Sequence, residues 1–135
     1  MANFTSFRGA FLDFLLADNA LTALVKKNIH MQELATLHPG SIVYPCVTVR
    51  IARGLQSTVV HQRFPIIIGA HSDVSEDESI SIIQTVGTRL QAPIFQTAVG
   101  NVVIFPSGTP ASVYVQTARL WHIYQRWTCH RVGIS

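Results

Sequence analysis

The chain has 135 residues, a length that predicts one domain over residues 1–135. Hydrophobic residues make up 48% and charged residues 13%, with a mean hydropathy of +0.31, which excludes intrinsic disorder because disorder requires low hydrophobicity and many charges. The formal net charge of +3 is too small to imply nucleic-acid binding by itself. The longest unbroken aliphatic run, Ile66–Ile68, is far shorter than the roughly 18 residues of a membrane span, so we expect a soluble domain.

The first residues and the cysteines indicate an intracellular setting. Polar residues interrupt the apolar ones between Met1 and Phe14, so we expect no secretory signal. Cys46 and Cys129 lie far apart in the sequence and outside any Cys-x-x-Cys pattern. We expect two reduced, part-buried thiols rather than a disulfide.

Two helices are predicted at the N-terminus, over residues 3–17 and 19–27. Asp18 separates them and is expected to cap the second helix. The first helix carries apolar residues at spacings of three and four, which indicates one buried stripe. These residues are Phe4, Phe7, Phe11, Phe14 and Leu15. Residues 28–42 show no period and are expected to form a connection.

A long β-hairpin is predicted next. Residues 42–51 alternate in polarity, Gly54 lies in the turn, and a second strand is expected over roughly 57–70. Pro65 cannot donate a ladder hydrogen bond, so we expect an edge position or a bulge there. The residues expected to face the core are Val43, Pro45, Val47, Val49, Ile51, Val60, Phe64, Ile66, Ile68 and Ala70.

A central helix is predicted to begin within residues 71–78 and to end before Pro93. Ser75 and Glu78 have the spacing of a capping box, and the acidic residues nearby suit the positive end of the helix dipole. A carboxylate cluster for metal binding or acid–base work is the alternative, but the chain has no second such cluster. The expected buried side of the helix consists of Ile80, Ile83, Val86, Gly87 and Leu90.

The last predicted elements are a short strand over residues 102–105 and a long strand from Val113 to about Arg131. Alternate residues of the long strand are expected to face the core, namely Val113, Val115, Trp121, Ile123, Trp127 and Cys129. The order of elements predicts an α+β fold, with a mostly antiparallel sheet and a long hairpin. An N-terminal helix and a central helix are expected to pack on one side of this sheet.

The sequence gives no positive sign of enzymatic or metal chemistry. The six histidines are scattered and lack the close pairs of a zinc site, and a Cys–His nucleophile pair has no local signature. The chain also lacks the motifs of phosphate-binding loops, dinucleotide sites, serine hydrolases and zinc proteases. We therefore expect no catalytic residue, no cofactor and no metal.

One group of residues could still form a functional surface. On the sheet face opposite the predicted core, three strands carry basic and aromatic residues together. These residues are Tyr44, Thr48, Arg50, His61, Arg63, His122, Tyr124, Arg126 and His130. A solvated outer face is one interpretation. A protein-binding face is the other, because Tyr and Arg are favoured at interfaces while Lys is depleted, and the chain has two lysines against eight arginines.

Several segments resemble the small tail-completion proteins of bacteriophages, also called tail terminators. Residues 11–25, with the sequence FLDFLLADNALTALV, are similar to the opening helix of that family, and residues 42–49, IVYPCVTV, are similar to its tyrosine–proline signature before a strand. The strand-to-helix passage from Arg63 to Leu90 and the long final strand are also similar. The resemblance covers nearly the whole chain in order, and it is poor over residues 28–41 and 93–112.

The resemblance implies a structural protein that forms a ring, usually of six subunits, on the head-proximal end of the tail tube. Such a ring ends tube polymerisation and joins the tail to the head–neck connector. The implied partners are further copies of the chain, the tail tube protein and the connector protein, with DNA only passing through the lumen and no membrane. The implied location is the tail–neck junction of the virion, after assembly in the host cytoplasm.

A cyclic ring requires two different surfaces that fit each other on neighbouring subunits. We expect the basic and aromatic face, with Arg50, Arg63, His122, Tyr124 and Arg126, to meet an acidic helix start. The acidic residues there are Asp73, Glu76, Asp77 and Glu78. A head-closure or connector adaptor of the neck is the nearest alternative function. A nucleic-acid-binding module and a small hydrolase using Cys129 or His130 are alternatives of other classes.

Overall fold

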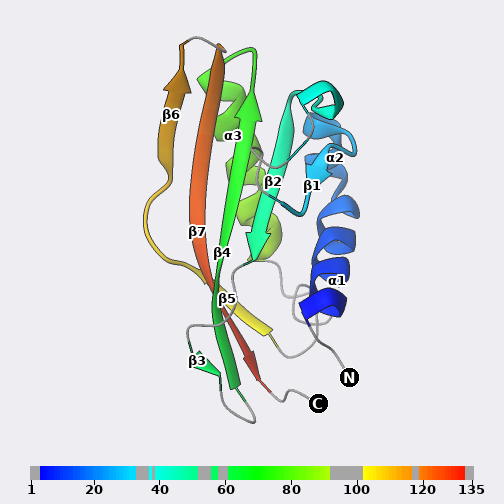
Figure 1. The fold of residues 1–135 in the computed structure, drawn as a ribbon, viewed down its shortest axis with the longest axis vertical. Coiled ribbons are helices and arrows are strands. Elements are labelled where there is room, and N and C mark those ends of the chain that lie inside the picture. The colour runs from blue at the N-terminus through cyan, green and yellow to red at the C-terminus, as the bar shows by residue number, and fades with distance from the viewer. Residues whose placement is uncertain are drawn as a thin grey trace.

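A mostly antiparallel sheet forms the frame of the molecule (Figure 1). The computed structural model describes residues 4–32, 37, 39–51, 56–57, 61–91, 102–116 and 119–132. The seven strands are β1 (Ile29–His30), β2 (Cys46–Ile51), β3 (Gln56–Ser57), β4 (His61–Ser72), β5 (Val102–Pro106), β6 (Ala111–Val115) and β7 (Leu120–Val132). Their order is β1-β2-β4-β7-β5, while β3 pairs with β4 and β6 pairs with β7. β1 runs parallel to β2, and the other described pairs are antiparallel.

Three α-helices accompany this sheet: α1 (Phe4–Leu16), α2 (Asn19–Val25) and α3 (Glu76–Leu90). A short 3-10 helix spans Pro39–Ser41. In Figure 1, α3 lies behind the sheet and α1 and α2 lie at its β1–β2 margin, so the face turned to the viewer carries none of the three α-helices. The α+β prediction, with helices packed on one side of an antiparallel sheet, is confirmed.

The hydrophobic core lies between the helices and one face of the sheet. α1 and α2 contribute Phe11, Phe14, Leu15, Leu21 and Val25, as their apolar spacing predicted. The sheet contributes Val47, Val49, Phe64, Ile66, Ile68, Ala70, Ile123, Trp127 and Cys129. The predicted inward positions of the hairpin and of β7 are confirmed at these residues.

Arg89 connects the end of α3 to the end of α1. Its Nε and Nη2 atoms donate hydrogen bonds of 3.1 and 3.0 Å to the Phe14 carbonyl oxygen. Its guanidinium carbon also lies 3.8 Å from the centre of the Phe14 ring. The last turn of a helix leaves carbonyl groups without helical partners, so a cation at this position stabilises α1 against α3.

The predicted N-caps at Asp18 and Ser75 are present, but only one half of the predicted Ser75–Glu78 capping box forms, because Ser72 replaces Glu78 as the partner of the Ser75 amide. Asp18 accepts a 3.0 Å hydrogen bond from the Ala20 amide, and Ser75 accepts one of 3.1 Å from the Glu78 amide. The Glu78 carboxylate accepts a 2.6 Å hydrogen bond from the Ser72 hydroxyl. The same hydroxyl oxygen accepts from the amides of residues 74 and 75 and so fixes the corner between β4 and α3.

Three predictions about element boundaries are wrong. Residues 28–42 are not only a connection, because β1 pairs with β2 through Ile29 and Val47. His71 and Ser72 end β4 instead of beginning the helix. The predicted long final strand is a pair of antiparallel strands, β6 and β7, in which Val115 pairs with Leu120. The chain reverses between them, so the side chain of Val113 lies on the face opposite to the core.

Smaller differences concern single side chains. In α3 the buried residues include Ser79 and Ile82, while Ile80 is only partly buried. Trp121 is half-buried at the margin of the core, beside Tyr114 of β6. Pro65 lies in the central strand β4, between the segment paired with β2 and the segment paired with β3. The predictions for Gly54, Val60 and Pro93 concern positions outside the described residues.

Candidate functional site

The sheet face that lacks the α-helices is called the open face here. Strand register places its side chains in rows that cross neighbouring strands. One row runs Arg50–Ile67–Arg126 across β2, β4 and β7. Arg50 and Arg126 are exposed and Ile67 between them is half-buried. Arg63, also exposed, lies nearer the β3 end of β4. These three residues form the basic set of the open face.

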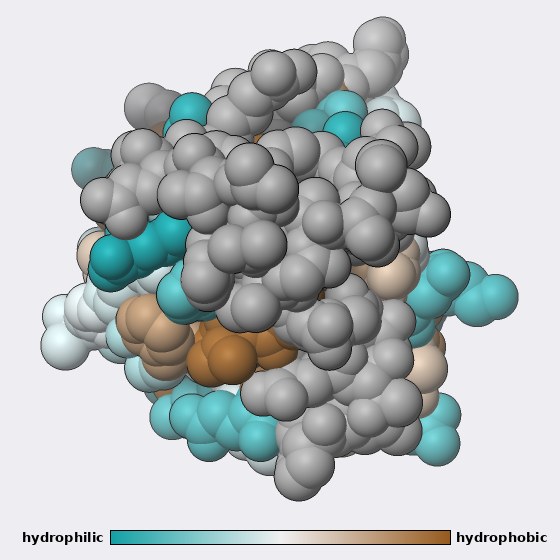
Figure 2. Space-filling model, turned by 90° about the horizontal axis from the view of Figure 1, so that it is seen from below, coloured by the Kyte–Doolittle hydropathy of each residue, from teal (hydrophilic) through white to brown (hydrophobic). Residues whose placement is uncertain are grey.

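Exposed apolar side chains share the open face with the basic set. Val103 and Phe105 of β5 are 47% and 42% exposed, and Val113 of β6 is 48% exposed. Their register partners on β7 are His130, Thr128 and His122, which places all three on the open face. Figure 2, the view from the lower end of Figure 1, shows brown hydrophobic surface beside teal hydrophilic side chains. Basic groups next to exposed apolar groups are typical of a protein-binding surface.

The acidic residues lie elsewhere, at the corner between β4 and α3. Asp73, Glu76 and Asp77 are exposed there, and between them Val74 is 66% exposed. Glu76 accepts a 2.7 Å hydrogen bond from the Ser112 hydroxyl of β6. These four residues, Asp73, Val74, Glu76 and Asp77, are called the acidic corner below.

The other end of the open face contains a buried histidine pair. The Nδ1 atoms of His71 and His122 lie 2.7 Å apart, and His71 Nε2 lies 2.8 Å from Thr48 Oγ1. Exposed fractions are 0% for His71, 6% for His122 and 5% for Thr48. Two nitrogens this close require one ring to donate and the other to accept, so at least the accepting ring is neutral. Tyr124 covers the pair, with its ring centre 5.6 Å from that of His71.

Gly69 makes this close arrangement possible. A Cβ atom at this position would lie 2.8 Å from Thr48 Oγ1, 2.9 Å from His71 Nε2 and 2.9 Å from Tyr124 Cε1. These distances are shorter than Cβ contacts in proteins, so the side chains of Thr48, His71 and Tyr124 converge over a position without a side chain.

Burial governs the protonation of this region. Burial, and then the nearby His122 and His30, lowers the pKa of His71 to about 3. Burial also lowers the pKa of His122. Burial and the Asp73 carboxylate raise the pKa of Cys46 to about 12, so this thiol is neutral. The cluster therefore has no charge near pH 7, in contrast to the basic set on the same face.

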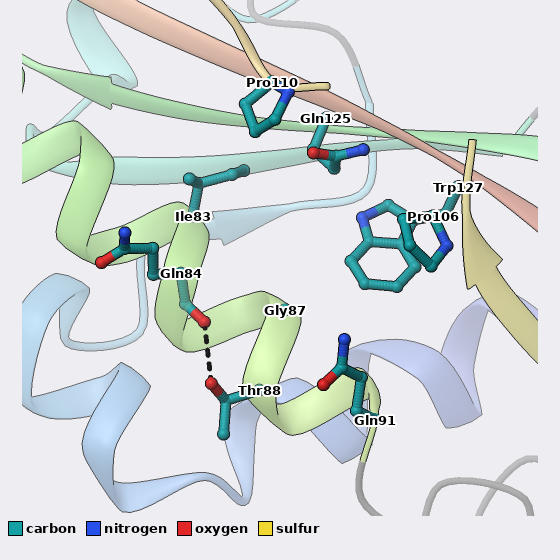
Figure 3. Close-up of a pocket in the computed structure, with 9 residues that line it drawn as sticks. All are labelled: Ile83, Gln84, Gly87, Thr88, Gln91, Pro106, Pro110, Gln125 and Trp127. Atoms are coloured by element: carbon teal, nitrogen blue, oxygen red, sulfur yellow. Dashed lines mark hydrogen bonds between the residues drawn. The ribbon is translucent and has the colours of Figure 1, made fainter. Parts of the chain in front are cut away.

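A separate cavity of about 500 Å³ lies on the opposite side of the sheet, between α3 and the strand margin (Figure 3). Gln84, Thr88 and Gln91 line it from α3, and Pro106 and Trp127 line it from the strands. The Gln125 amide nitrogen donates to the carbonyl oxygens of Gly108 and Arg126. Among the described lining residues no side chain is titratable, so these residues offer neither a general acid nor a general base.

The structure brings some of the predicted interface residues together. Arg50 and Arg126 share one row with Ile67, and Tyr124 is 37% exposed above the adjacent row. His122 lies on the predicted face but is buried beneath it, next to Tyr124. The side chain of His61 lies outside the described ones. Asp73 and Glu76 are exposed together at the acidic corner.

Two features of the site were missed from the sequence. His71 was assigned to a helix start. In β4 it lies an even number of positions from Arg63, so the alternation of side chains would have placed both on the open face. The exposed apolar side chains on the open face were also missed. Val103 and Phe105 were predicted to lie in a short strand but were not assigned to a face, and Val113 was assigned to the core. Extending the alternation of β4 by two residues would have found His71.

The described residues contain no group of three or more His, Cys, Asp or Glu side chains that could hold a metal ion. Cys46 and Cys129 are free and buried, as predicted. Within the described ranges, no helix has both the length and the apolar character needed to cross a membrane.

Comparison with known proteins identifies the fold. No family model matches the chain, and no curated protein matches it. Among solved structures, a chain of the "Virion of native gene transfer agent (GTA) particle" is similar, with a TM-score of 0.70 and 16% sequence identity. The similarity covers 93% of this chain and 94% of that chain. The chain therefore shares its fold, over nearly its whole length, with a chain of that virion.

Proposed function

We propose that this chain is a structural protein of a phage-like virion that forms a ring on the head-proximal end of the tail tube. The ring ends tube polymerisation and presents a surface to the head–neck connector. The observation that carries the proposal is the shared fold with a virion chain over 93% of the residues. The sequence resemblance to tail-completion proteins, described above, points to the tail end in particular.

The proposed mechanism is assembly, in which no covalent bond is made or broken. A tube grows as long as its end exposes the surface that the next subunit binds, and a bound ring removes that surface. This role needs extended binding surfaces, and the cavity, whose described lining residues carry no titratable group, does not contribute to it. The basic set, the apolar residues on the same face and the acidic corner are such surfaces.

The proposed contact residues are Arg50, Arg63, Tyr124 and Arg126 on the open face, with Asp73 and Glu76 at the acidic corner. His122 is buried and would act by positioning Tyr124, whose ring it contacts at a centre-to-centre distance of 6.2 Å. The proposed partners are further copies of the chain, six in a ring, together with the tail tube protein and the connector protein.

Tube length tests the proposal directly. The tube protein of the same particle is allowed to polymerise with and without an equimolar amount of this chain, and tube lengths are measured by electron microscopy. We expect shorter tubes carrying a ring at one end. In a lysate whose gene for this chain is deleted, we expect overlong tails that lack heads. Tails of normal length beside unjoined heads would favour the adaptor function instead, and unchanged, head-joined tails would refute both.

A further inference from the structure

We infer that the basic set of one copy binds the acidic corner of a second copy, so that the chain associates head to tail. The inference rests on the proposed ring and names its subunit contact. Its occupant is a second copy of this chain, because the two surfaces are complementary in charge and both carry exposed apolar side chains.

Charge is separated on this chain to an unusual degree. By strand register, the described positions of the open face carry the three arginines of the basic set and no Asp or Glu. Four of the seven acidic residues of the chain fall in the segment 73–78, where Asp73, Glu76 and Asp77 are exposed. Surfaces of opposite sign steer association and fix its register.

Both proposed contact surfaces also carry exposed apolar side chains. Ile67 is half-buried in the arginine row, and Val103 and Phe105 of the neighbouring β5 are exposed on the same face. The acidic corner presents Val74, which has the largest exposed fraction among the described large hydrophobic residues. A contact between the two surfaces would remove apolar area from water as well as pair charges.

The two surfaces cannot satisfy each other within one copy. Arg63 lies near the start of β4 and Asp73 directly follows its last residue, so the strand holds them apart. The contact is therefore heterologous, since one surface meets a different surface of the neighbour. A heterologous contact produces a ring when its rotation closes and a filament when it does not.

Charge reversal in two separate variants gives a sharp test. Arg63→Glu/Arg126→Glu makes the basic set acidic, and Asp73→Lys/Asp77→Lys makes the acidic corner basic. The second pair spares Glu76 and Glu78, whose carboxylates accept hydrogen bonds from Ser112 and Ser72. Each variant alone should associate about 30-fold or more weakly than the natural chain, because like charges then face each other.

An equimolar mixture of the two variants should recover association. The acidic face of the first variant fits the basic corner of the second, and the remaining surfaces fit equally well. The mixed ring must alternate, so native mass spectrometry with one variant labelled with ¹⁵N should find equal numbers of each. Lys26→Glu/Lys27→Glu is the matched control, because it changes the net charge as much as the first variant at two exposed residues after α2.

The outcomes separate this inference from the proposed function. It is wrong if the natural chain is monomeric, if either reversed variant associates normally, or if the mixture remains dissociated while both variants keep the near-ultraviolet circular dichroism of the natural chain. Should a reversed variant unfold, Arg63→Gln/Arg126→Gln and Asp73→Asn/Asp77→Asn replace them. Each neutral variant should associate weakly alone. Their mixture should recover pairs only, because the natural basic set of Asp73→Asn/Asp77→Asn meets the natural acidic corner of Arg63→Gln/Arg126→Gln while the other two surfaces are both neutralised; a mixture without such pairs would overturn the inference. Rings that form as described but leave tube length unchanged would refute the tail-capping function alone.

Discussion

Replacing Gly69 by Ala tests the buried end of the open face with a single methyl group. The new Cβ would lie within 3 Å of Thr48 Oγ1, His71 Nε2 and Tyr124 Cε1, so at least one of these side chains must move. Thr48 and His71 are buried and joined by a 2.8 Å hydrogen bond, and His71 is also joined to His122. The methyl group therefore introduces steric strain and displaces a hydrogen-bonded side chain from its partner.

The cost follows from three terms. Overpacking a well-packed site costs about 1–3 kcal/mol. Leaving a buried polar group without its partner costs about 1–3 kcal/mol more. Ala is favoured over Gly within a strand by about 0.5–1 kcal/mol, which offsets part of this loss. We expect Gly69→Ala to lower the free energy of unfolding by about 1–5 kcal/mol, a large fraction of the about 5–15 kcal/mol that holds a domain folded.

Urea denaturation followed by tryptophan fluorescence measures this difference. Gly9→Ala is the matched control, because a Cβ at Gly9 would meet nothing within 4 Å and the residue lies inside α1. We expect the control to raise the free energy of unfolding by about 0.5–1 kcal/mol. The reasoning fails if Gly69→Ala is as stable as the natural chain, because the three side chains then cannot converge as described.

Three further predictions concern stability. Phe11→Ala should lower the free energy of unfolding by about 3–5 kcal/mol because Phe11 is fully buried, whereas Trp121→Ala should lower it less because Trp121 is half-buried. Equal losses in urea denaturation would contradict this. Arg89→Ala should cost about 1–3 kcal/mol and Arg89→Lys only part of it, because one ammonium cannot reproduce both hydrogen bonds to the Phe14 carbonyl. Burial lowers the pKa of His71 to about 3, whereas the unfolded chain takes up this proton near pH 6.5, so the unfolded state binds more protons between these values. The contribution of His71 to the free energy of unfolding should thus stay level above pH 7 and fall by up to about 1.4 kcal/mol per pH unit below 6.5, and His71→Gln should reduce this slope in urea titrations at stepped pH.

The helices and the central strands were predictable because their signals are local. The spacing of apolar residues in α1 reflects burial on one side, and Asp18 and Ser75 have the chemistry of helix caps. The β6–β7 turn had no such signal, since residues 116–119 contain none of the usual turn formers and Arg119 adopts a φ of 52°. The pairing of β6 with β7 holds Arg119, a non-glycine residue, at this positive φ. The local sequence pattern does not contain that pairing.

The candidate site was predictable only in part, for a related reason. Alternation along a strand assigns side chains to a face, so the exposed Arg63 and Arg126 were placed correctly. Alternation does not say whether a residue on that face is buried. The packing of Thr48 and His71 depends on Gly69, which lies between Thr48 and Tyr124 in the register and leaves room for the His71 and Tyr124 rings to approach over the sheet.

β4 connects the buried histidine pair to the proposed subunit contact. Arg63 is ten positions before Asp73 in the sequence, and Ile67, whose row holds Arg50 and Arg126, is six positions before it. A strand rises about 3.3 Å per residue, so the basic set lies about 20–30 Å from Asp73, which follows β4 directly. β4 is paired with β7 along its length and with β2 over residues 66–71. The hydrogen bonds of His71 to Thr48 and His122 connect the same three strands, β2, β4 and β7. The next residue, Ser72, bonds to Glu78 and fixes the corner between β4 and α3. A ring closes only if every subunit presents its two contact surfaces at the same separation and angle. The neutral, tightly hydrogen-bonded end of the open face would supply that stiffness, which is a role for two buried histidines that needs no proton transfer.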